Sequence, residues 1–332
     1  MASPELKILA LSIPLLIVGV LLNLSVGEVF IPIGYILDPS PLYRVVILDI
    51  RLPEALAAVV VGVDLALAGA TMQSIFRNPL AEPYVTGTAS GALLGALLGI
   101  LIAVPLGLGG PVPYVLMPML AFLGALASTS LVVLFGRGEW LSMILAGIAV
   151  SIMFSAVVMI LDTYILAMRP TLTLPAVVYL LFGTLSGVNW VDVAVMLIIS
   201  TPCITYLALK THELNLVMIS DELAQSGGVE PKAFRNNMLV VTGLLTASAI
   251  SFTGIIGFVG LITPHLTRFL ANTSDNRRVI PLSAILGSTV MLYSNVLSKV
   301  LVPGVAIPIT AITSLFGVPT LLILLRRGGG HG

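Results

Sequence analysis

Charged residues are scarce in this chain of 332 residues, since only 9% of them are Asp, Glu, Lys or Arg. Ordinary globular domains carry about 25% charged residues. Hydrophobic residues make up 58% of the sequence, and the mean hydropathy is +1.12. So few charges could not cover the surface of a water-soluble protein of this size, and the composition therefore predicts an integral membrane protein.

The sequence also lacks the signatures of several other protein classes. Acidic and basic residues balance at 15 each, so the net charge indicates neither a nucleic acid nor an acidic partner. The single Cys203 excludes an intramolecular disulfide and a cysteine-based metal cluster. No G-x-x-x-x-G-K-[ST] phosphate loop occurs, so this chain is not expected to hydrolyse ATP. The three histidines are scattered, and no Ser/His/Asp constellation is present; we expect no enzyme, no metal site and no cofactor here.

Long continuous apolar runs predict membrane-spanning α-helices, because a span needs about 20 mostly apolar residues. The strands of a membrane barrel would instead alternate apolar and polar residues over about 10 positions. The whole chain, residues 1–332, is expected to form a single all-α membrane domain, with a flexible tail at 328–332. The ten predicted spans are 8–26, 53–74, 84–105, 113–135, 140–166, 191–209, 235–253, 255–271, 279–300 and 307–326.

Three segments depart from the pattern of long, clearly separated spans. The first apolar run is taken as a span and not as a signal peptide, because no small-residue cleavage pattern follows it. Gly254, Gly257 and Gly260 interrupt the seventh and eighth spans without a polar loop, so these spans are either two crossings or include a re-entrant break. The apolar segment Thr171–Val188 is short and bounded by prolines, and is expected to lie at the interface or to re-enter.

Basic residues are divided unequally between the two sides of the predicted bundle. With ten spans, 11 of the 15 Lys and Arg residues share the side of the termini. The other four are Arg44, Arg51, Arg169 and Lys299. Because Lys and Arg concentrate in cytoplasmic loops, we expect a multi-pass protein of the cell (inner/cytoplasmic) membrane with both termini in the cytoplasm.

The longest polar stretch, residues 211–237, falls on the predicted cytoplasmic side. Ser220 and Leu223 fit the N-cap and an apolar position of a short helix that Gly227–Gly228 would end. Pro231 suits the first turn of a second short helix. The stretch is either a solvated connector or a docking element for a soluble partner.

A few residues within the predicted spans stand out from their apolar surroundings. Gly87, Gly91, Gly95 and Gly99 recur every four residues and predict close helix packing, within the chain or between subunits. Asp64 lies near the middle of its span, and is either a hydrogen-bonded packing residue or a group lining a transport pathway.

Three further residues lie near the ends of spans. His265 is more readily explained by packing than by metal binding. Arg51 and Lys299, at outer helix ends, are either interfacial anchors or contacts for an external acidic partner.

Several long motifs resemble the permease family of type II ABC importers, which carry iron–siderophore complexes, haem or cobalamin. They are RLPEALAAVVVGVDLALAGATMQSIFRNPLAEPYVTGTASGA at 51–92, GTLSGVNW at 183–190, the segment SDELAQSGGV, GIIGFVGLITPHLTRFL followed by DNRRVIPLSAILGS within 254–288, and IPITAITSLFGVPTLLILLRR at 307–327. The resemblance spans nearly the whole chain. It implies a permease fold of ten helices per subunit, a homodimer, two separate ATP-binding subunits that use ATP and Mg, and an extracytoplasmic substrate-binding protein.

The resemblance also implies roles for individual residues. It makes RNPLAEP the cytoplasmic turn between the second and third spans, with Arg77 in water. It assigns Ser220, Asp221, Glu222, Leu223, Ala224, Gly227 and Gly228 to contact with the ATPase, and Arg51 and Lys299 to docking of the binding protein. It places Asp64, Thr86, Ser90 and Thr310 along the translocation pathway, and Arg77, Asn78, Pro79, Gly87, Gly91, Gly260, Pro264 and His265 in structural motifs.

The sequence departs from the family pattern at several positions, namely Glu54, Asp64, Thr86, Ala306 and Thr310, the last of which replaces a common glycine. The resemblance as a whole implies that the chain is the membrane subunit of an ATP-driven importer, which moves an iron chelate, haem or corrinoid by alternating access. A molybdate or tungstate importer of the same family is an alternative. An ion-coupled secondary transporter and a non-transporting membrane scaffold remain alternatives from other classes.

Overall fold

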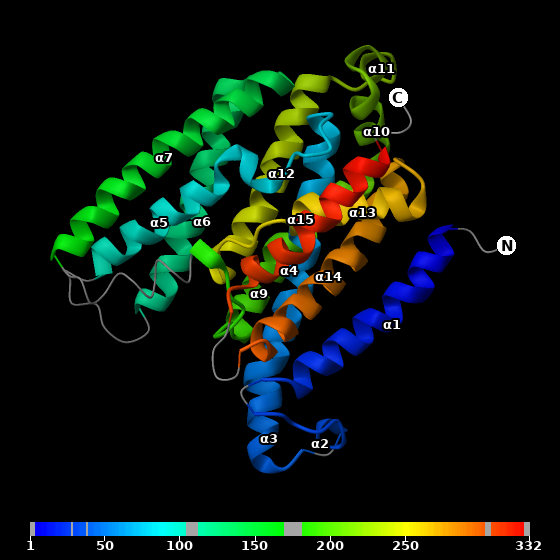
Figure 1. The fold of residues 1–332 in the computed structure, drawn as a ribbon. Helices are drawn as coiled ribbons and strands as arrows, with labels where there is room; N and C mark the ends of the chain where they lie inside the picture. The colour runs from blue at the N-terminus through cyan, green and yellow to red at the C-terminus, as the bar shows by residue number, and fades with distance from the viewer. Residues whose placement is uncertain are drawn as a thin grey trace.

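The computed structural model describes residues 4–27, 29–37, 39–103, 112–168, 181–302 and 307–328. These residues form a bundle of long helices and contain no strand, which confirms the predicted all-α fold (Figure 1). The short helices α10 (Thr211–Ile219) and α11 (Asp221–Ser226) lie at one end of the bundle, and α2 (Gly34–Leu37) and α3 (Pro41–Val45) lie at the other. We call these the α10–α11 end and the α2–α3 end.

Each of the ten predicted spans has a helix in the described part of the chain. They are α1 (Pro4–Ser25), α4 (Leu52–Ile75), α5 (Thr88–Ala103), α6 (Val112–Gly136), α7 (Trp140–Met168), α9 (Trp190–Leu209), α12 (Pro231–Thr253), α13 (Val259–Ala271), α14 (Asn276–Val300) and α15 (Ile309–Gly328). Among the described residues, six continuous helices are long and apolar enough to cross a membrane, namely α1, the run ending in α4, α6, α7, α9 and α14, and α5 and α15 are shorter apolar helices.

Helix α4 is the centre of the fold, with α12, α13, α14 and α9 around it. Nearly all its residues are buried, which fits a helix that is apolar on every face. Its small residues allow this crowding. A methyl group on Gly62 would collide with the backbone of Gly287 in α14, and one on Gly69 with the backbone of Gly260 in α13. The backbones of α13 and α14 therefore each pack directly against the backbone of α4.

The helix containing α4 starts earlier than predicted. A continuous helix runs from Pro41 to Ile75, and residues Val46–Arg51 (η1) form a π-helical segment within it. The prediction began the span at Pro53, because proline usually marks a helix start. The wider π turn before Pro53 relieves the clash that the proline ring would otherwise make with the preceding turn.

The predicted eighth span is shorter than expected. Helix α13 begins at Val259, four residues after the predicted start, and residues 254–258 are not helical. Its 13 residues extend about 20 Å at 1.5 Å per residue, which is less than the roughly 30 Å of a bilayer core. The glycine-marked interruption is therefore a real break between two helices of the bundle.

The four-residue glycine repeat lies mainly on α5 and packs within the chain. A methyl group on Gly91 would collide with the carbonyl of Gly124, and one on Gly95 with the carbonyl of Leu120, both in α6. The glycine face therefore joins α5 to α6, which settles the question that the sequence left open. Gly87 has a φ of 73° and connects the 3-10 turn η2 (Pro83–Thr86) to α5.

The start of α1, the start of α14 and the end of α15 all lie toward the α10–α11 end (Figure 1). An ion pair between Glu5 and Arg278 joins the first two. This arrangement agrees with the prediction that both ends of the chain share one side. Most of the expected interfacial segment Thr171–Val188, together with Ala306 and the tail residues 329–332, lies outside the described residues.

Candidate functional site

The segment predicted to couple to an ATPase folds as two short helices. The hydroxyl of Ser220 accepts a hydrogen bond of 3.0 Å from the backbone N–H of Leu223 and caps α11, as predicted. Gly228, with a φ of 77°, ends the turn after α11. The prediction of a second short helix at Pro231 is wrong, because Pro231 opens the long helix α12 itself.

Helix α10 (Thr211–Ile219) was not predicted, because the short helix expected in this stretch was placed after Ser220. It nevertheless buries Leu214 and Val217. A methyl group on Gly227, at the end of α11, would lie 2.7 Å from the Cδ1 atom of Leu216 in α10. The two short helices therefore pack closely on one another.

The motif RNP ends α4 with a specific backbone turn. The N–H of Asn78 donates to the carbonyl of Gln73 at 3.1 Å, and the N–H of Arg77 donates to Ser74 at 3.3 Å. Arg77 has a φ of 49°, in the left-handed region that this Schellman-type end requires. Pro79 follows at a position where the helix has already ended.

The side chain of Arg77 explains why an arginine occupies a position that usually favours glycine. Its guanidinium donates to the carbonyl of Val217 in α10 at 2.9 and 2.7 Å, and it forms an ion pair with Asp221 in α11. The prediction that Arg77 lies in water holds only in part, since 28% of its side chain is exposed while its Nε and Nη2 atoms bond to α10 and α11. The end of α4 is therefore fastened to both short helices.

A second arginine meets the same carboxylate. Arg235, in the second turn of α12, is fully buried and pairs with both carboxylate oxygens of Asp221. It also donates to the carbonyls of Ile75 and Gly138, each at 3.3 Å. Sequence reasoning did not single out Arg235, because it lies in the polar sequence PKAFRNN at the start of α12 and there resembles any other cytoplasmic basic residue. We call Arg77, Asp221 and Arg235 the Asp221 cluster.

The electrostatics of the Asp221 cluster favour an ionised carboxylate. The hydrogen bond from Arg235 is the largest cause that holds the pKa of Asp221 below its ordinary value of 3.8, and Arg77 acts in the same direction. One carboxylate thus joins α11 to α4 and α12 through charge-assisted hydrogen bonds, which are stronger than neutral ones.

Helix α10 is fixed to the start of α14 by a second set of contacts. The amide of Asn215 donates to Asp275 at 2.5 Å and accepts from the N–H of Asn276 at 2.8 Å. The Asn276 side chain in turn accepts a hydrogen bond of 3.1 Å from Ser74 in α4. The α10–α11 hairpin is therefore bonded directly to α4, to α12 and to the start of α14.

The outward face of the hairpin has the character of a docking surface. Ala224 of α11 is buried, whereas Ile219 and Leu223 are exposed by 64% and 39% of their surface. Glu222 is exposed beside them. Two exposed apolar side chains next to a carboxylate form a compact surface at the tip of the hairpin.

The two basic residues expected at the outer side are occupied by contacts within the chain. Arg51 is buried, and its guanidinium donates to the carbonyls of Leu24 at 2.7 Å, Ser25 at 2.8 Å and Val29, which caps the end of α1. Lys299, at the end of α14, forms an ion pair with Glu54. Docking of a partner by these residues stays a prediction, and it requires these contacts to open.

The residues expected along a pathway divide into two groups. Asp64 and Thr86 are fully buried. Asp64 accepts a hydrogen bond of 2.5 Å from Ser200 in α9, and its other oxygen has no hydrogen-bond partner among the described residues. Ser90 and Thr310 are partly exposed. Asp64 is thus buried against α9, and a role along the pathway stays a prediction.

Two residues of the predicted structural motifs lie in the middle of α13, between Leu261 and Arg268, which both hydrogen-bond to α4. Pro264 is buried within the helix, and His265 beside it is partly exposed. Within the described part of the chain, His265 joins no cluster of three metal-ligating side chains.

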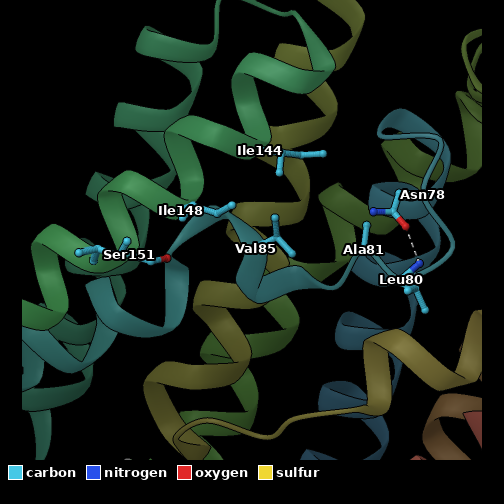
Figure 2. A pocket seen from close by; sticks show the side chains of 8 residues that line it. Asn78, Leu80, Ala81, Val85, Ile144, Ile148 and Ser151 are labelled. Atoms are coloured by element: carbon cyan, nitrogen blue, oxygen red, sulfur yellow. Dashed lines mark hydrogen bonds between the residues drawn. The ribbon is translucent and has the colours of Figure 1, made fainter.

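A groove with a volume of about 320 Å³ lies between the loop that follows α4 and the helix α7. Figure 2 shows Ile144, Ile148 and Ser151 of α7 on one side and Ala81 and Val85 on the other. The Asn78 side chain accepts a hydrogen bond of 2.9 Å from the N–H of Leu80 and shapes this loop (Figure 2). The lining is mostly apolar, as expected for a surface that contacts lipid or another helix.

Comparisons with known proteins agree with this architecture. A profile of the FecCD transport family matches residues 15–327. The uncharacterized ABC transporter permease YvrB of Bacillus subtilis is 34% identical and covers 95% of this chain and 92% of its own length. The vitamin B12 import system permease BtuC of Klebsiella pneumoniae is 32% identical and covers 96% of this chain and 93% of its own length.

Two solved structures extend the comparison. An ABC transporter assigned to the metal-chelate type, in an inward-facing conformation, superposes with a TM-score of 0.83 at 31% identity, over 97% of this chain and 99% of the other. PsaBC of Streptococcus pneumoniae in complex with Fab shares the fold with a TM-score of 0.59, at 19% identity over 87% and 92% of the two chains. The chain therefore belongs to the FecCD transport family and is a permease of the type II ABC importers.

Proposed function

We propose that this permease is the membrane subunit of an ATP-driven importer that moves an iron–siderophore complex, haem or a corrinoid into the cytoplasm. The observation that carries this proposal is the Asp221 cluster, because it fastens an exposed helical hairpin to the central helices of the bundle. The names of the relatives support the cargo class, since one imports vitamin B12 and another is assigned to metal chelates.

The proposed mechanism is alternating access driven by partner subunits. Two separate ATPases, which bind ATP and Mg, would contact the surface formed by Ile219, Glu222 and Leu223. Their movement would displace α11, and the ion pairs of Asp221 would carry the displacement to α4 and α12. Reversing the populations of two conformations requires a differential interaction of about 5.5 kcal/mol, which ATP binding by the partners would supply.

We further propose that the chain works as a homodimer with the α10–α11 end in the cytoplasm. Of the long apolar helices, α7 is the least buried within one chain, because only 11% of its most apolar stretch is buried. A second copy packed against α7 would cover this surface and enclose a pathway between the subunits. An extracytoplasmic binding protein would dock at the α2–α3 end, near Arg51 and Lys299.

Ion-coupled transport without ATP is less well supported. Such transporters place accessible ionisable groups near the membrane midplane. Asp64 is the acidic residue that sequence placed there, and it is fully buried and hydrogen-bonded to Ser200.

The proposal is tested with proteoliposomes that contain this chain, its ATPase and its binding protein. A ferric siderophore, haem, cobalamin and molybdate are offered in turn on the binding-protein side. We expect uptake of one of the first three that requires ATP. Uptake of molybdate alone would replace the cargo assignment, and uptake driven by an ion gradient without ATP would refute the mechanism.

A further inference from the structure

The break between α12 and α13 exposes backbone groups that no helix satisfies. Residues 254–258 lie between the two helices, and Gly254 and Ile256 are buried while Ile255, Gly257 and Phe258 are partly exposed. Non-helical backbone at membrane depth persists only where its N–H and C=O groups find partners in the protein or in a hydrated cavity. Gly254 and Phe258, at the two ends of the break, are paired with the adjoining helices. The three residues between them are partnered by side-chain hydroxyls from two other elements.

Tyr84 of η2 makes the first of these contacts. Its hydroxyl donates a hydrogen bond of 2.7 Å to the carbonyl of Ile256 and accepts one of 3.1 Å from the N–H of the same residue. A single hydroxyl thus satisfies both backbone groups of Ile256. Removing only this oxygen would leave the tyrosine ring in place and both groups unpaired.

Two threonines of α15 make the other contacts. The hydroxyl of Thr310 donates to the carbonyl of Ile255 at 2.7 Å and accepts from the N–H of Gly257 at 3.3 Å. The hydroxyl of Thr313 donates to the carbonyl of Gly257 at 2.9 Å. The backbone groups of three successive residues are therefore held by hydroxyls.

The backbone of the break is strained at its far end. Phe258 has a φ of 69°, in the left-handed region that large side chains rarely adopt. Such conformations persist when the surrounding contacts hold them, and they concentrate at segments that switch. A methyl group on Gly257 would meet only Thr310 Cγ2, at 3.6 Å, so the chain has space to move there.

We propose that the α12–α13 break is a hinge, and that Tyr84 and Thr310 are positioning residues that latch it during the transport cycle. These hydrogen bonds join the break to η2 and α15, while α12 is fastened to the hairpin through Arg235. Displacement of α12 would then turn α13 about the break, with hydroxyl hydrogen bonds exchanging as it moves. This inference rests on the proposed importer function.

The test uses the complete transporter, with its ATPase and binding protein, in lipid nanodiscs. Hydrogen–deuterium exchange of the peptide covering 254–258 is compared between Tyr84→Phe, Thr310→Val and the unsubstituted protein. Each substitution is expected to raise exchange there about fivefold, as the loss of one net hydrogen bond implies. Thr310→Ser keeps the hydroxyl and should restore protection.

Thr320→Val is the matched control, because the Thr320 hydroxyl bonds only to Phe316 within its own helix α15. It should leave exchange at the break unchanged. Unchanged exchange in both Tyr84→Phe and Thr310→Val would overturn the latch. If only one of them responds, the latch is refuted for the other residue.

The hinge itself is tested by comparing the nucleotide-free transporter with one trapped by a non-hydrolysable ATP analogue. We expect exchange at 254–258 in the unsubstituted protein to differ at least about threefold between these states, and the difference to vanish in Tyr84→Phe. Equal exchange in both states would refute the hinge. This readout needs no cargo, so a failure of import in proteoliposomes would refute the proposed function separately.

Discussion

Replacing Asp221 by asparagine tests whether the Asp221 cluster holds the α10–α11 hairpin. The substitution keeps the size of the side chain and removes its charge. Arg235 is fully buried and would lose its counter-charge, although it would keep the carbonyls of Ile75 and Gly138. Arg77 would keep the carbonyl of Val217.

The size of the effect follows from burial. Removing one partner of a fully buried ion pair costs about 3–5 kcal/mol. The Asp221 side chain is 31% exposed, and the asparagine oxygen can still accept one hydrogen bond. We therefore expect a loss of about 2 kcal/mol, within the range for a hydrogen bond to a charged group. This corresponds to about a 30-fold shift toward detached hairpins, at 1.4 kcal/mol for each factor of ten.

The assay is hydrogen–deuterium exchange of the α11 peptide in nanodiscs, together with ATPase stimulation by the binding protein. The control is Glu213→Gln, which breaks an ion pair with Lys210 on α10 that is partly exposed and local to one helix turn. Such pairs contribute less than about 1 kcal/mol. Equal protection of α11 in the two variants would refute the role that we give to the cluster.

Three further outcomes are expected. Gly95→Ala should lower the melting temperature of the detergent-solubilised protein by several degrees, because its methyl group meets the α6 backbone. Gly99→Ala should lower the melting temperature less, since its methyl group would lie 3.2 Å from Met117. Equal shifts in the two variants would contradict the packing argument. Asp64→Asn should keep the hydrogen bond from Ser200 and retain ATP-driven uptake, and a loss of uptake at unchanged stability would mean that the carboxyl group takes part in transport. Because the pKa of Asp221 is lowered on folding, its contribution to the attachment of α11 is complete above pH 3.8 and is lost as the pH falls through the lower folded value. A fluorescent label on α11 should therefore report attachment from neutral pH down to about pH 4. Release of α11 at about pH 5 to 6 would contradict the assignment.

The sequence predicted the helices well because the membrane imposes a strong local rule. Apolar runs of sufficient length had to be helical, and each of the ten observed helices begins within four residues of the predicted start. The exception is the turn that precedes α4, because the continuous helical run there already starts at Pro41. The cap at Ser220 was predictable for the same local reason, since its partner Leu223 is three residues away. Local chemistry decides these features.

The contacts that build the site could not be read from the sequence. Arg77 and Asp221 are 144 positions apart, and the positive-inside pattern gave Arg77 a sufficient explanation without a partner. Likewise, Tyr84 and Ile256 are separated by 172 positions. Nothing in the local pattern distinguishes a tyrosine that satisfies a broken helix from one that anchors at an interface. Only the fold brings such groups together.

The central position of α4 has a consequence for how the protein is made. Helix α4 ends at Ile75, whereas α9, α12 and α14, which cover it, begin at Trp190, Pro231 and Asn276. During cotranslational insertion α4 therefore enters the bilayer before the helices that bury Asp64 and Ser74 have been synthesised. Polar side chains are costly in hydrocarbon, so the insertion machinery must shield this helix until later ones arrive. Helix α4 is therefore almost fully buried in the finished protein, but its polar side chains lack their partners while the chain is being inserted.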